Sequence, residues 1–189
     1  MLSVVIATQD SERALLPTLA ALVAGAAAGL VREVIVADAG SRDATLAIAD
    51  EAGCRVLASG RARGARLKAA AATARASWLL FLRPGVVLEA SWVDETRRFI
   101  DDAELRKDTS TYAVFRAGPL RPTVLEALGL LRAAFGAKPT ASQGLVIARS
   151  FYDALGGHRD VEEPERDLLR RLGRRRLVRL RTGAISDIT

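Results

Sequence analysis

The sequence predicts an α/β fold in which a mostly parallel sheet is flanked by helices. Strand-type and helix-type patterns alternate over the first 82 residues, as in a doubly wound sheet. The strand-type runs are short and apolar, which is typical of parallel strands buried on both faces. Half of the 189 residues are hydrophobic, and no repeat or low-complexity linker divides the chain. We therefore expect a single domain over residues 1–189 with a sizeable core.

The first half predicts strands and helices in strict alternation. Strands are expected at residues 3–8, 33–37, 55–58 and 78–82, and helices at 11–28, 42–52 and 62–76. Ser41 is placed to cap the second helix and Gly53 to end it, because serine caps helix N-termini and glycine favours the backbone that follows a helix. The Arg83-Pro84-Gly85 segment ends the fourth strand, since proline cannot donate to a sheet ladder.

The second half follows a looser pattern. Helices are expected at residues 91–103, 122–135 and 166–172, strands at 111–116 and 143–148, a short helix before Gly156-Gly157, and a basic strand-like run at 176–181. The regular alternation of the first half is therefore lost after Gly85.

Positive charge is concentrated near the C-terminus. The chain has a net charge of +6, whereas residues 166–181 alone hold eight arginines and one acid, a local charge of +7. Leu168, Leu169 and Leu172 share one side of a helix there, which favours an ordinary amphipathic surface helix. Contact with anionic lipid is the second interpretation. Nucleic acid is a distant third, because no aromatic stacking platform accompanies the arginines.

The composition argues against a secreted or membrane-spanning chain. Cys54 is the only cysteine, so no internal disulfide forms, and it is expected to be a buried small residue in a reducing cytoplasm. The apolar stretch 14–30 contains Pro17, Gly25 and Gly29 and barely reaches spanning length. The start of the chain lacks the basic lead of a signal peptide. We expect a cytoplasmic protein, with peripheral contact at the inner membrane face as the alternative.

Residues 34–45 carry the strongest functional signal. A β-branched run leads to Asp38 at the expected strand end, and Gly40 permits a sharp turn directly afterwards. The carboxyl ends of parallel strands face the ligand crevice, so Asp38 is placed to accept hydrogen bonds from a ribose or a base. The alternative is that Asp38 merely caps its turn. This segment alone leaves the two interpretations equal.

These motifs together resemble the family 2 glycosyltransferases, which have the GT-A fold, over approximately residues 3–180. The family's Asp-x-Gly-Ser-x-Asp-x-Thr signature matches at Asp38, Gly40, Ser41, Asp43 and Thr45. The opening strand resembles the one that meets the nucleotide with a Pro-Thr pair, of which Thr8 is retained. Residues 61–68 resemble an Arg-Gly element, with Gly64 retained and Lys68 in place of asparagine, and residues 143–157 resemble the acceptor-side strand, helix and double glycine.

The resemblance implies an inverting transfer of a sugar from a UDP- or GDP-type donor, in bacterial cell-wall or polysaccharide biosynthesis. Residues 1–88 would bind the nucleotide and 89–189 the acceptor, which is unknown and in one alternative is lipid-linked. Glu165 falls at the position of the catalytic base. The donor would be bound by Thr8, Asp38, Gly40, Ser41, Gly64, Lys68 and Arg83, with Asp38 on the nucleoside.

Two departures from the family pattern change the expected chemistry. The carboxylates that hold a divalent metal should follow Leu82, but Arg83 stands there, and Mg²⁺ or Mn²⁺ needs oxygen ligands. We therefore expect no metal site. Instead, Arg83 would bind the diphosphate through its guanidinium group, helped by the cations of residues 61–68 (Arg61, Arg63, Arg66 and Lys68). The Glu-Asp dipeptide that carries the family's catalytic base is also replaced, by Pro164-Glu165.

Plainer interpretations stand beside these functional ones. Arg61 and Arg63 are expected on a solvated face rather than in the site, Lys68 is expected in the site, and Arg83 could belong to a plain turn. Glu165 could be a first-turn acid favoured by the helix dipole. His158 is placed at the rim of the acceptor pocket, as a substrate contact or as a loop histidine without a role.

Two rival functions follow from the same observations. A non-catalytic relative would keep only nucleotide binding or a scaffold role, which the missing carboxylates favour. A Rossmann oxidoreductase is disfavoured, because no Gly-x-Gly-x-x-Gly motif follows the first strand.

Overall fold

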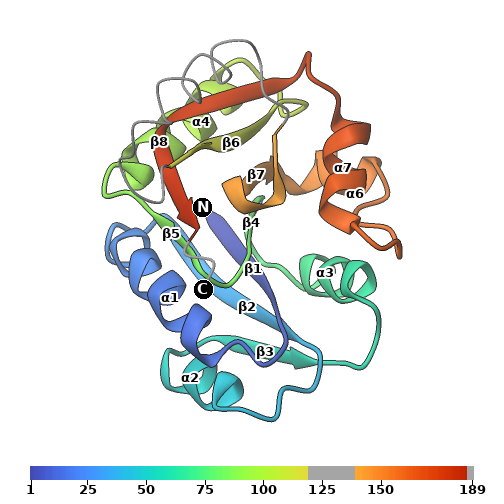
Figure 1. The fold of residues 1–189 in the computed structure, drawn as a ribbon. Helices are drawn as coiled ribbons and strands as arrows, with labels where there is room; N and C mark the ends of the chain where they lie inside the picture. Colours follow the sequence, from blue (N-terminus) through green and yellow to red (C-terminus); the bar gives the residue numbers. More distant parts are fainter. Residues whose placement is uncertain (119–138, 187–189) are drawn as a thin grey trace, which may run out of the picture.

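The computed structural model describes residues 1–118 and 139–186, which form one eight-stranded sheet with helices on both faces (Figure 1). The strand order is β3-β2-β1-β4-β7-β6-β8-β5. The expected α/β class with a mostly parallel sheet is confirmed. The helix expected at 122–135 lies outside the described residues.

Four parallel strands make up the first half of the sheet. They are β1 (Leu2–Thr8), β2 (Val31–Asp38), β3 (Arg55–Ala58) and β4 (Trp78–Leu82). Every residue of β1 and β4 is buried, as their continuous apolar runs predict. Thr8 pairs with Asp38 in the register of β1 and β2, so these two strands end side by side.

The connecting helices are α1 (Glu12–Ala27), α2 (Thr45–Glu51) and α3 (Arg63–Ala72). Gly53 follows α2 with a φ of +69°, as expected of a helix end. The expected cap by Ser41 is wrong, because α2 begins later, at Thr45, and the Ser41 hydroxyl is used within the preceding turn. Burial raises the pKa of the Cys54 thiol to about 11, so this cysteine stays protonated at neutral pH.

The second half of the sheet is mixed. Strand β7 (Leu145–Ala148) runs antiparallel to β4 and to β6 (Tyr112–Ala117). Strand β8 (Leu177–Ser186) lies parallel to β6 and antiparallel to the edge strand β5 (Val86–Leu88). Three-residue β5 was not predicted, because its pairing partner lies about a hundred residues further along the chain.

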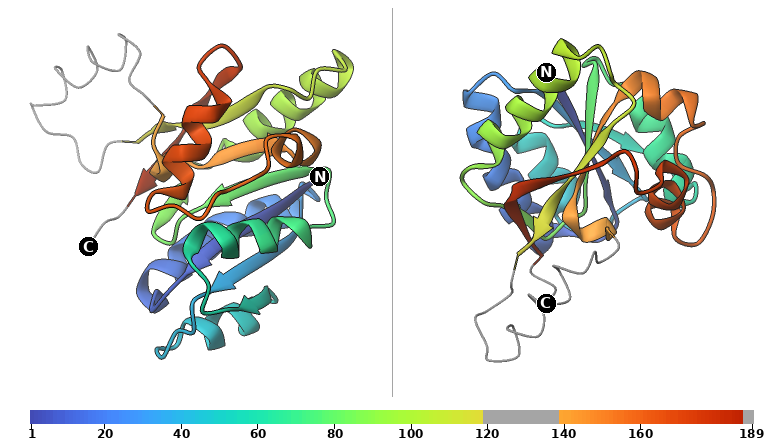
Figure 2. Two further views of the ribbon diagram at one scale, coloured as in Figure 1. Left: turned by 90° about the vertical axis from the view of Figure 1, so that its right-hand side faces the viewer. Right: turned by 90° about the horizontal axis from the view of Figure 1, so that it is seen from above.

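The remaining helices are α4 (Trp92–Leu105), η1 (Ala141–Gln143), α6 (Arg149–Ala154) and α7 (Pro164–Leu172). Helices α1, α2 and α4 lie on one face of the sheet, whereas α3, α6 and α7 gather on the other (Figure 1 and Figure 2). The second group brings α7 beside the start of α3. Within the described ranges, no helix has both the length and the apolar character needed to cross a bilayer.

Close packing of α1 against α4 depends on Gly25. The indole of Trp92 is 1% exposed, and its Nε1 donates a hydrogen bond to the Ala21 carbonyl at 3.0 Å. A Cβ at Gly25 would lie 2.4 Å from the Trp92 ring and 2.9 Å from a Val31 methyl group. The glycine is therefore required by the approach of the ring, not by its backbone angles.

We expect Gly25→Ala to lower the free energy of unfolding by about 1–3 kcal/mol, because the buried ring must move. This loss should exceed the gain of about 1 kcal/mol that alanine offers in a helix. Chemical denaturation measures the change as a shift in midpoint. Gly60→Ala is the matched control, since a Cβ there meets nothing within 4 Å. Equal midpoints for the two variants would contradict this account of the packing.

Candidate functional site

A groove of about 600 Å³ lies where β1 and β4 end and α3 begins. Among the residues that the structure describes, none with a carboxylate lines it. Four of its residues are arginines, namely Arg61, Arg63, Arg66 and Arg83. A concave surface lined by charges of one sign attracts ions of the opposite sign, so the groove suits an anionic ligand.

The Asp38 carboxylate lies beside this groove and is completely buried. It accepts hydrogen bonds from the hydroxyls of Thr8 and Ser41 at 2.8 and 2.6 Å, and from the backbone N–H groups of Gly40 and Ser41 at 2.6 and 2.7 Å. Burial alone would raise its pKa, but these hydrogen bonds hold the pKa below its ordinary value. All four bonds come from its own chain. A contact between this carboxylate and a nucleoside would require one of them to open.

The other signature side chains join two loops. Ser41, Thr45 and Asp43 each accept a backbone N–H from residues 10–12, at 2.8, 2.7 and 3.0 Å. In the opposite direction, Glu12 accepts the backbone N–H of Ala44 at 3.0 Å. The signature therefore holds the loop after β1 against the loop after β2. The first of these loops forms one wall of the groove.

Arg66 is the most deeply placed cation of the groove. It is 7% exposed, and its Nη1 donates to the carbonyls of Thr8 and Ala37 at 2.9 and 2.5 Å. Lys68, which was expected in the site, is exposed on α3 and is not among the residues that line the groove. Arg63, expected on a solvated face, lines the groove instead. Arg63 and Lys68 thus exchange their expected places. The reason is that Arg63 and Arg66 lie on the side of α3 that faces the groove, whereas Lys68 lies on its exposed side.

Glu165 on α7 meets two of the groove's arginines. Its Oε1 lies 2.6 Å from Arg63 Nη2 and 3.3 Å from Arg83 Nε. The Glu165 side chain is 12% exposed. Burial alone would raise its pKa, but Arg63 and Arg83 hold the pKa below its ordinary value. The carboxylate is therefore ionised at neutral pH, and it balances part of the charge of the groove.

Gly64 allows this meeting without lining the groove. A Cβ on Gly64 would lie 1.9 Å from the Arg159 carbonyl oxygen and 3.1 Å from Pro164. The start of α3 consequently packs directly against the segment that leads into α7. Any side chain at Gly64 would push Glu165 away from Arg63.

His158 lies behind the groove rather than at a pocket rim. It is 2% exposed, and its Nδ1 lies 2.9 Å from the hydroxyl of Tyr152. Burial lowers the pKa of His158 to about 4, with Glu165 opposing and Arg171 reinforcing the shift. The expectation of an exposed loop histidine is wrong. Tyr152 was not among the predicted site residues, because its contact with His158 depends on the Gly156-Gly157 turn between them.

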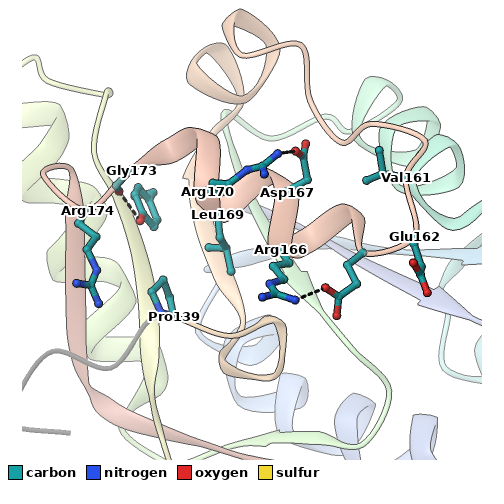
Figure 3. Close-up of a pocket in the computed structure, with 11 residues that line it drawn as sticks. Pro139, Val161, Glu162, Arg166, Asp167, Leu169, Arg170, Gly173 and Arg174 are labelled. Atoms are coloured by element: carbon teal, nitrogen blue, oxygen red, sulfur yellow. Dashed lines mark hydrogen bonds and ion pairs between the residues drawn. The ribbon is translucent and has the colours of Figure 1, made fainter. Parts of the chain in front are cut away.

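A second cavity of about 600 Å³ is lined by residues of α7 together with Pro139 and Tyr112 (Figure 3). Leu169 and Val161 contribute apolar surface. Two pairs of its charged side chains are ion pairs, Arg166 with Glu163 at 2.7 Å and Arg170 with Asp167 at 2.9 Å. These pairs leave it without the excess of cations found in the groove.

The inner side of α7 faces the core. Leu168 is completely buried, and Leu169 and Leu172 are 9% and 4% exposed. The amphipathic pattern of α7 is therefore that of a surface helix on a domain, the first of the three interpretations. Its apolar side is not available for insertion into a lipid layer.

The residues after β4 do not fit a divalent metal ion. Arg83 stands directly after Leu82, and its guanidinium group points toward Glu165 rather than toward a second carboxylate. In residues 1–118 and 139–186, no three His, Cys, Asp or Glu side chains are grouped to hold an ion. Glu89, the next acid, accepts the backbone N–H of Gly183 at 2.7 Å and so joins β5 to β8.

Comparison with known structures reveals the same architecture elsewhere. The structure of TarS residues 1–349 from S. aureus superposes with a TM-score of 0.72 at 16% identity, covering 98% of this chain and 60% of that one. TarS in complex with UDP-GlcNAc gives a TM-score of 0.71 at 17% identity, covering 100% and 59%. The chain thus spans about 60% of the length of these two TarS structures.

A third similar structure is glucosyl-3-phosphoglycerate synthase from Mycobacterium tuberculosis, in complex with Mn²⁺, UDP and glucosyl-3-phosphoglycerate. Its TM-score is 0.62 at 17% identity, and the match covers 100% of this chain and 72% of that one. At these identities the likeness establishes the fold. A search of curated proteins by sequence found no match.

The family assignment rests on the sequence itself. The family model described as glycosyl transferase family 2 matches residues 3–105, which is more than half of the chain. The matched part contains the interlocked signature loops and the four arginines of the groove. The chain belongs to glycosyl transferase family 2.

Proposed function

We propose that this chain transfers a sugar from a nucleotide-sugar donor to an acceptor hydroxyl, with the donor's diphosphate bound in the arginine-lined groove. The convergence of Arg61, Arg63, Arg66 and Arg83 on one groove carries the proposal. Family membership supports it, because the groove lies at the carboxyl ends of strands within the matched part of the chain. Guanidinium groups bind phosphate oxygens with two parallel hydrogen bonds, which suits a diphosphate leaving group.

The arginines of the groove would stabilise the leaving diphosphate, as a metal ion does in other members of the family. The bond between the sugar C1 and the diphosphate oxygen breaks, and its electron pair stays on the diphosphate. Fixed cations stabilise that developing charge without having to reorganise. Since the residues after β4 do not fit a metal, we infer that donor binding is independent of divalent ions. We further infer a UDP-type donor, by analogy with TarS and the synthase, which were both solved with UDP.

Glu165 is the proposed general base. The acceptor hydroxyl would form the new bond to C1 from the face opposite the diphosphate, inverting C1, while its proton passes to Glu165. In the free protein, Oε1 of Glu165 is held by Arg63 and Arg83. A diphosphate in the groove would compete for the same two guanidinium groups. Donor binding would then weaken the hold on Glu165 and raise its basicity.

A non-catalytic role is the second candidate, and two observations favour it. Asp38 accepts all four of its hydrogen bonds from its own turn and from its neighbour Thr8. Glu165 is also neutralised by arginines rather than left facing solvent. A protein with these features could bind a nucleotide without turning it over. Turnover measurements separate the two candidates.

We expect UDP to raise the melting temperature equally with Mn²⁺ and with EDTA. A ligand at about a hundred times its Kd adds about 2.7 kcal/mol. That gain corresponds to a shift of roughly 2–4 °C per kcal/mol. Arg83→Gln should remove most of the shift, because it removes a charged partner of the diphosphate.

Arg98→Gln serves as the control, since the Arg98 side chain is 74% exposed on α4 and pairs with Glu95 on the same helix. A shift that appears only with Mn²⁺ would contradict the metal-independent site. The same shift in Arg83→Gln as in the unmodified chain would remove Arg83 from it.

We expect Glu165→Gln to lower kcat for sugar transfer, or for donor hydrolysis, by about 10²–10⁴-fold, the usual contribution of a general base. The same variant should bind UDP at least as tightly as the unmodified chain, because the amide no longer competes for Arg63 and Arg83. Calorimetry measures the affinity and product release measures the rate. Glu51→Gln, on the exposed end of α2, is the control. Unchanged turnover would leave Glu165 as a counter-ion only.

We also propose that the arginines of residues 166–181 contact anionic lipid, as a lipid-linked acceptor would require. With the leucines of α7 buried, this contact would be electrostatic. The chain should therefore sediment with phosphatidylglycerol vesicles at low salt. It should be released at about 0.5 M salt, where the Debye length is short and the attraction between charges is screened. Equal retention on neutral phosphatidylcholine vesicles would contradict the proposal.

A further inference from the structure

A small cavity behind the groove contains two polar groups whose hydrogen-bonding capacity is unmet. The cavity has a volume of about 20 Å³, and Arg83, Thr140, His158 and Glu165 line it together with apolar residues and Gly144. Among the described residues, the buried atoms His158 Nε2 and Glu165 Oε2 have no hydrogen-bond partner. Leaving either atom unpaired costs free energy, so both should be satisfied in the working protein.

The hydrogen bonds of Tyr152 determine which nitrogen of His158 carries the proton. The Tyr152 hydroxyl accepts the backbone N–H of His158 at 3.0 Å and lies 2.9 Å from Nδ1. Burial raises the pKa of Tyr152 to about 12, so the hydroxyl keeps its hydrogen and can donate it to Nδ1. In that arrangement Nδ1 is unprotonated. A neutral imidazole then carries its hydrogen on Nε2, the nitrogen without a partner.

The surroundings hold the imidazole rigidly. Gly157 has a φ of +68°, and a Cβ there would lie 2.9 Å from the Tyr152 ring, so the turn packs directly on that ring. Arg171 of α7 donates to the carbonyls of Leu155 and Gly157 at 2.8 and 2.6 Å. The turn is thus fastened to the helix that also carries Glu165. Phe81 covers the imidazole in an edge-on contact, with ring centroids 4.7 Å apart.

We propose that His158, held in its Nε2–H form by Tyr152, is a positioning residue for Glu165 and acts through one water molecule in the small cavity. The Nε2–H group donates to the water, and the water donates to Oε2 of Glu165. About 20 Å³ accommodates one water, and a buried water needs two or more polar partners, which these two atoms provide. With Oε1 held by arginines and Oε2 by the water, both oxygens of the carboxylate are fixed in direction. This inference rests on the proposed role of Glu165 as base.

Several charged groups act on His158 and must be considered in any titration. They are Glu165, Asp167 and Arg171 of α7, and Arg63 of α3. The first two favour the imidazolium and the arginines oppose it, with burial as the largest influence. The imidazole should therefore remain neutral down to about pH 4. It donates a hydrogen bond throughout the neutral range but does not itself exchange protons there.

The histidine can be observed directly, because the chain contains only one. In protein labelled with ¹⁵N at histidine, long-range ¹H–¹⁵N correlation spectra distinguish the two tautomers. We expect the Nε2–H form from pH 8 down to pH 5, a change of the Nε2 resonance in Glu165→Gln, and loss of the single tautomer in Tyr152→Phe. An Nδ1–H form, or an Nε2 chemical shift that is unchanged in Glu165→Gln, would overturn the inference without any measurement of activity.

Kinetics test the consequence for catalysis. We expect His158→Phe, which fills the same space, to lower kcat about tenfold while KM for the donor stays within about twofold, because one charge-assisted hydrogen bond is lost. The acid limb of the kcat–pH profile should move to higher pH, since losing a donor to its anionic form raises the pKa of Glu165. His158→Gln keeps an N–H donor near the Nε2 position and should restore most of kcat.

The outcomes separate the two proposals. If Glu165→Gln slows turnover but His158→Phe, folded by its melting temperature, does not, the positioning role is wrong and the base remains. Equal losses in His158→Phe and His158→Gln indicate packing alone, which also overturns the inference. If Glu165→Gln turns over normally, the proposed base fails and the positioning role falls with it, whereas UDP binding can still succeed.

Discussion

The buried carboxylate of Asp38 is the constraint on which the rest of the site depends. It joins the last residue of β1 to the turn after β2 through bonds to Thr8, Gly40 and Ser41. A buried charge is tolerated only when it is fully hydrogen-bonded, so this turn has essentially one conformation. The neighbouring signature side chains then fasten the loop after β1 in place. In this molecule the signature residues 38–45 therefore serve chiefly to hold the loops that border the groove.

Charge balance explains the other side of the site. Four arginines gathered in one groove repel one another, and Arg66 lies in it almost without solvent. Arg66 is stabilised by carbonyls at the ends of β1 and β2, and Arg63 and Arg83 are stabilised by Glu165. The free protein thus supplies an internal anion where a diphosphate is proposed to bind. In the proposed mechanism, the diphosphate and Glu165 would be linked because they share the same cations.

Much of the first half could be predicted from local patterns. Strands β3 and β4 have the expected bounds. Strand β4 is buried and appears in the sequence as an unbroken apolar run between turn residues, whereas β3 is a partly exposed edge strand that follows the glycine at the end of α2. The convergence of Arg83 with the start of α3 was likewise anticipated, since both follow strands that end at the same edge. Which α3 cations enter the groove was not, because one helical turn separates an inward from an outward side chain. Strand β5 escaped detection for a different reason, since its three residues are stabilised only by a distant partner.

The amino-acid pattern by itself determined the fold class, the signature turn and the absence of a carboxylate directly after Leu82, because these depend on residue types and short spacings. Only the tertiary structure decided that Arg63, Arg83 and Glu165 meet, because these residues lie far apart in the sequence and the packing of α3 and α7 on one face of the sheet brings them together. It also decided that the Asp38 carboxylate accepts four hydrogen bonds from Thr8, Gly40 and Ser41, and that His158 is buried against Tyr152, because residue types and spacings do not specify hydrogen-bond partners or burial.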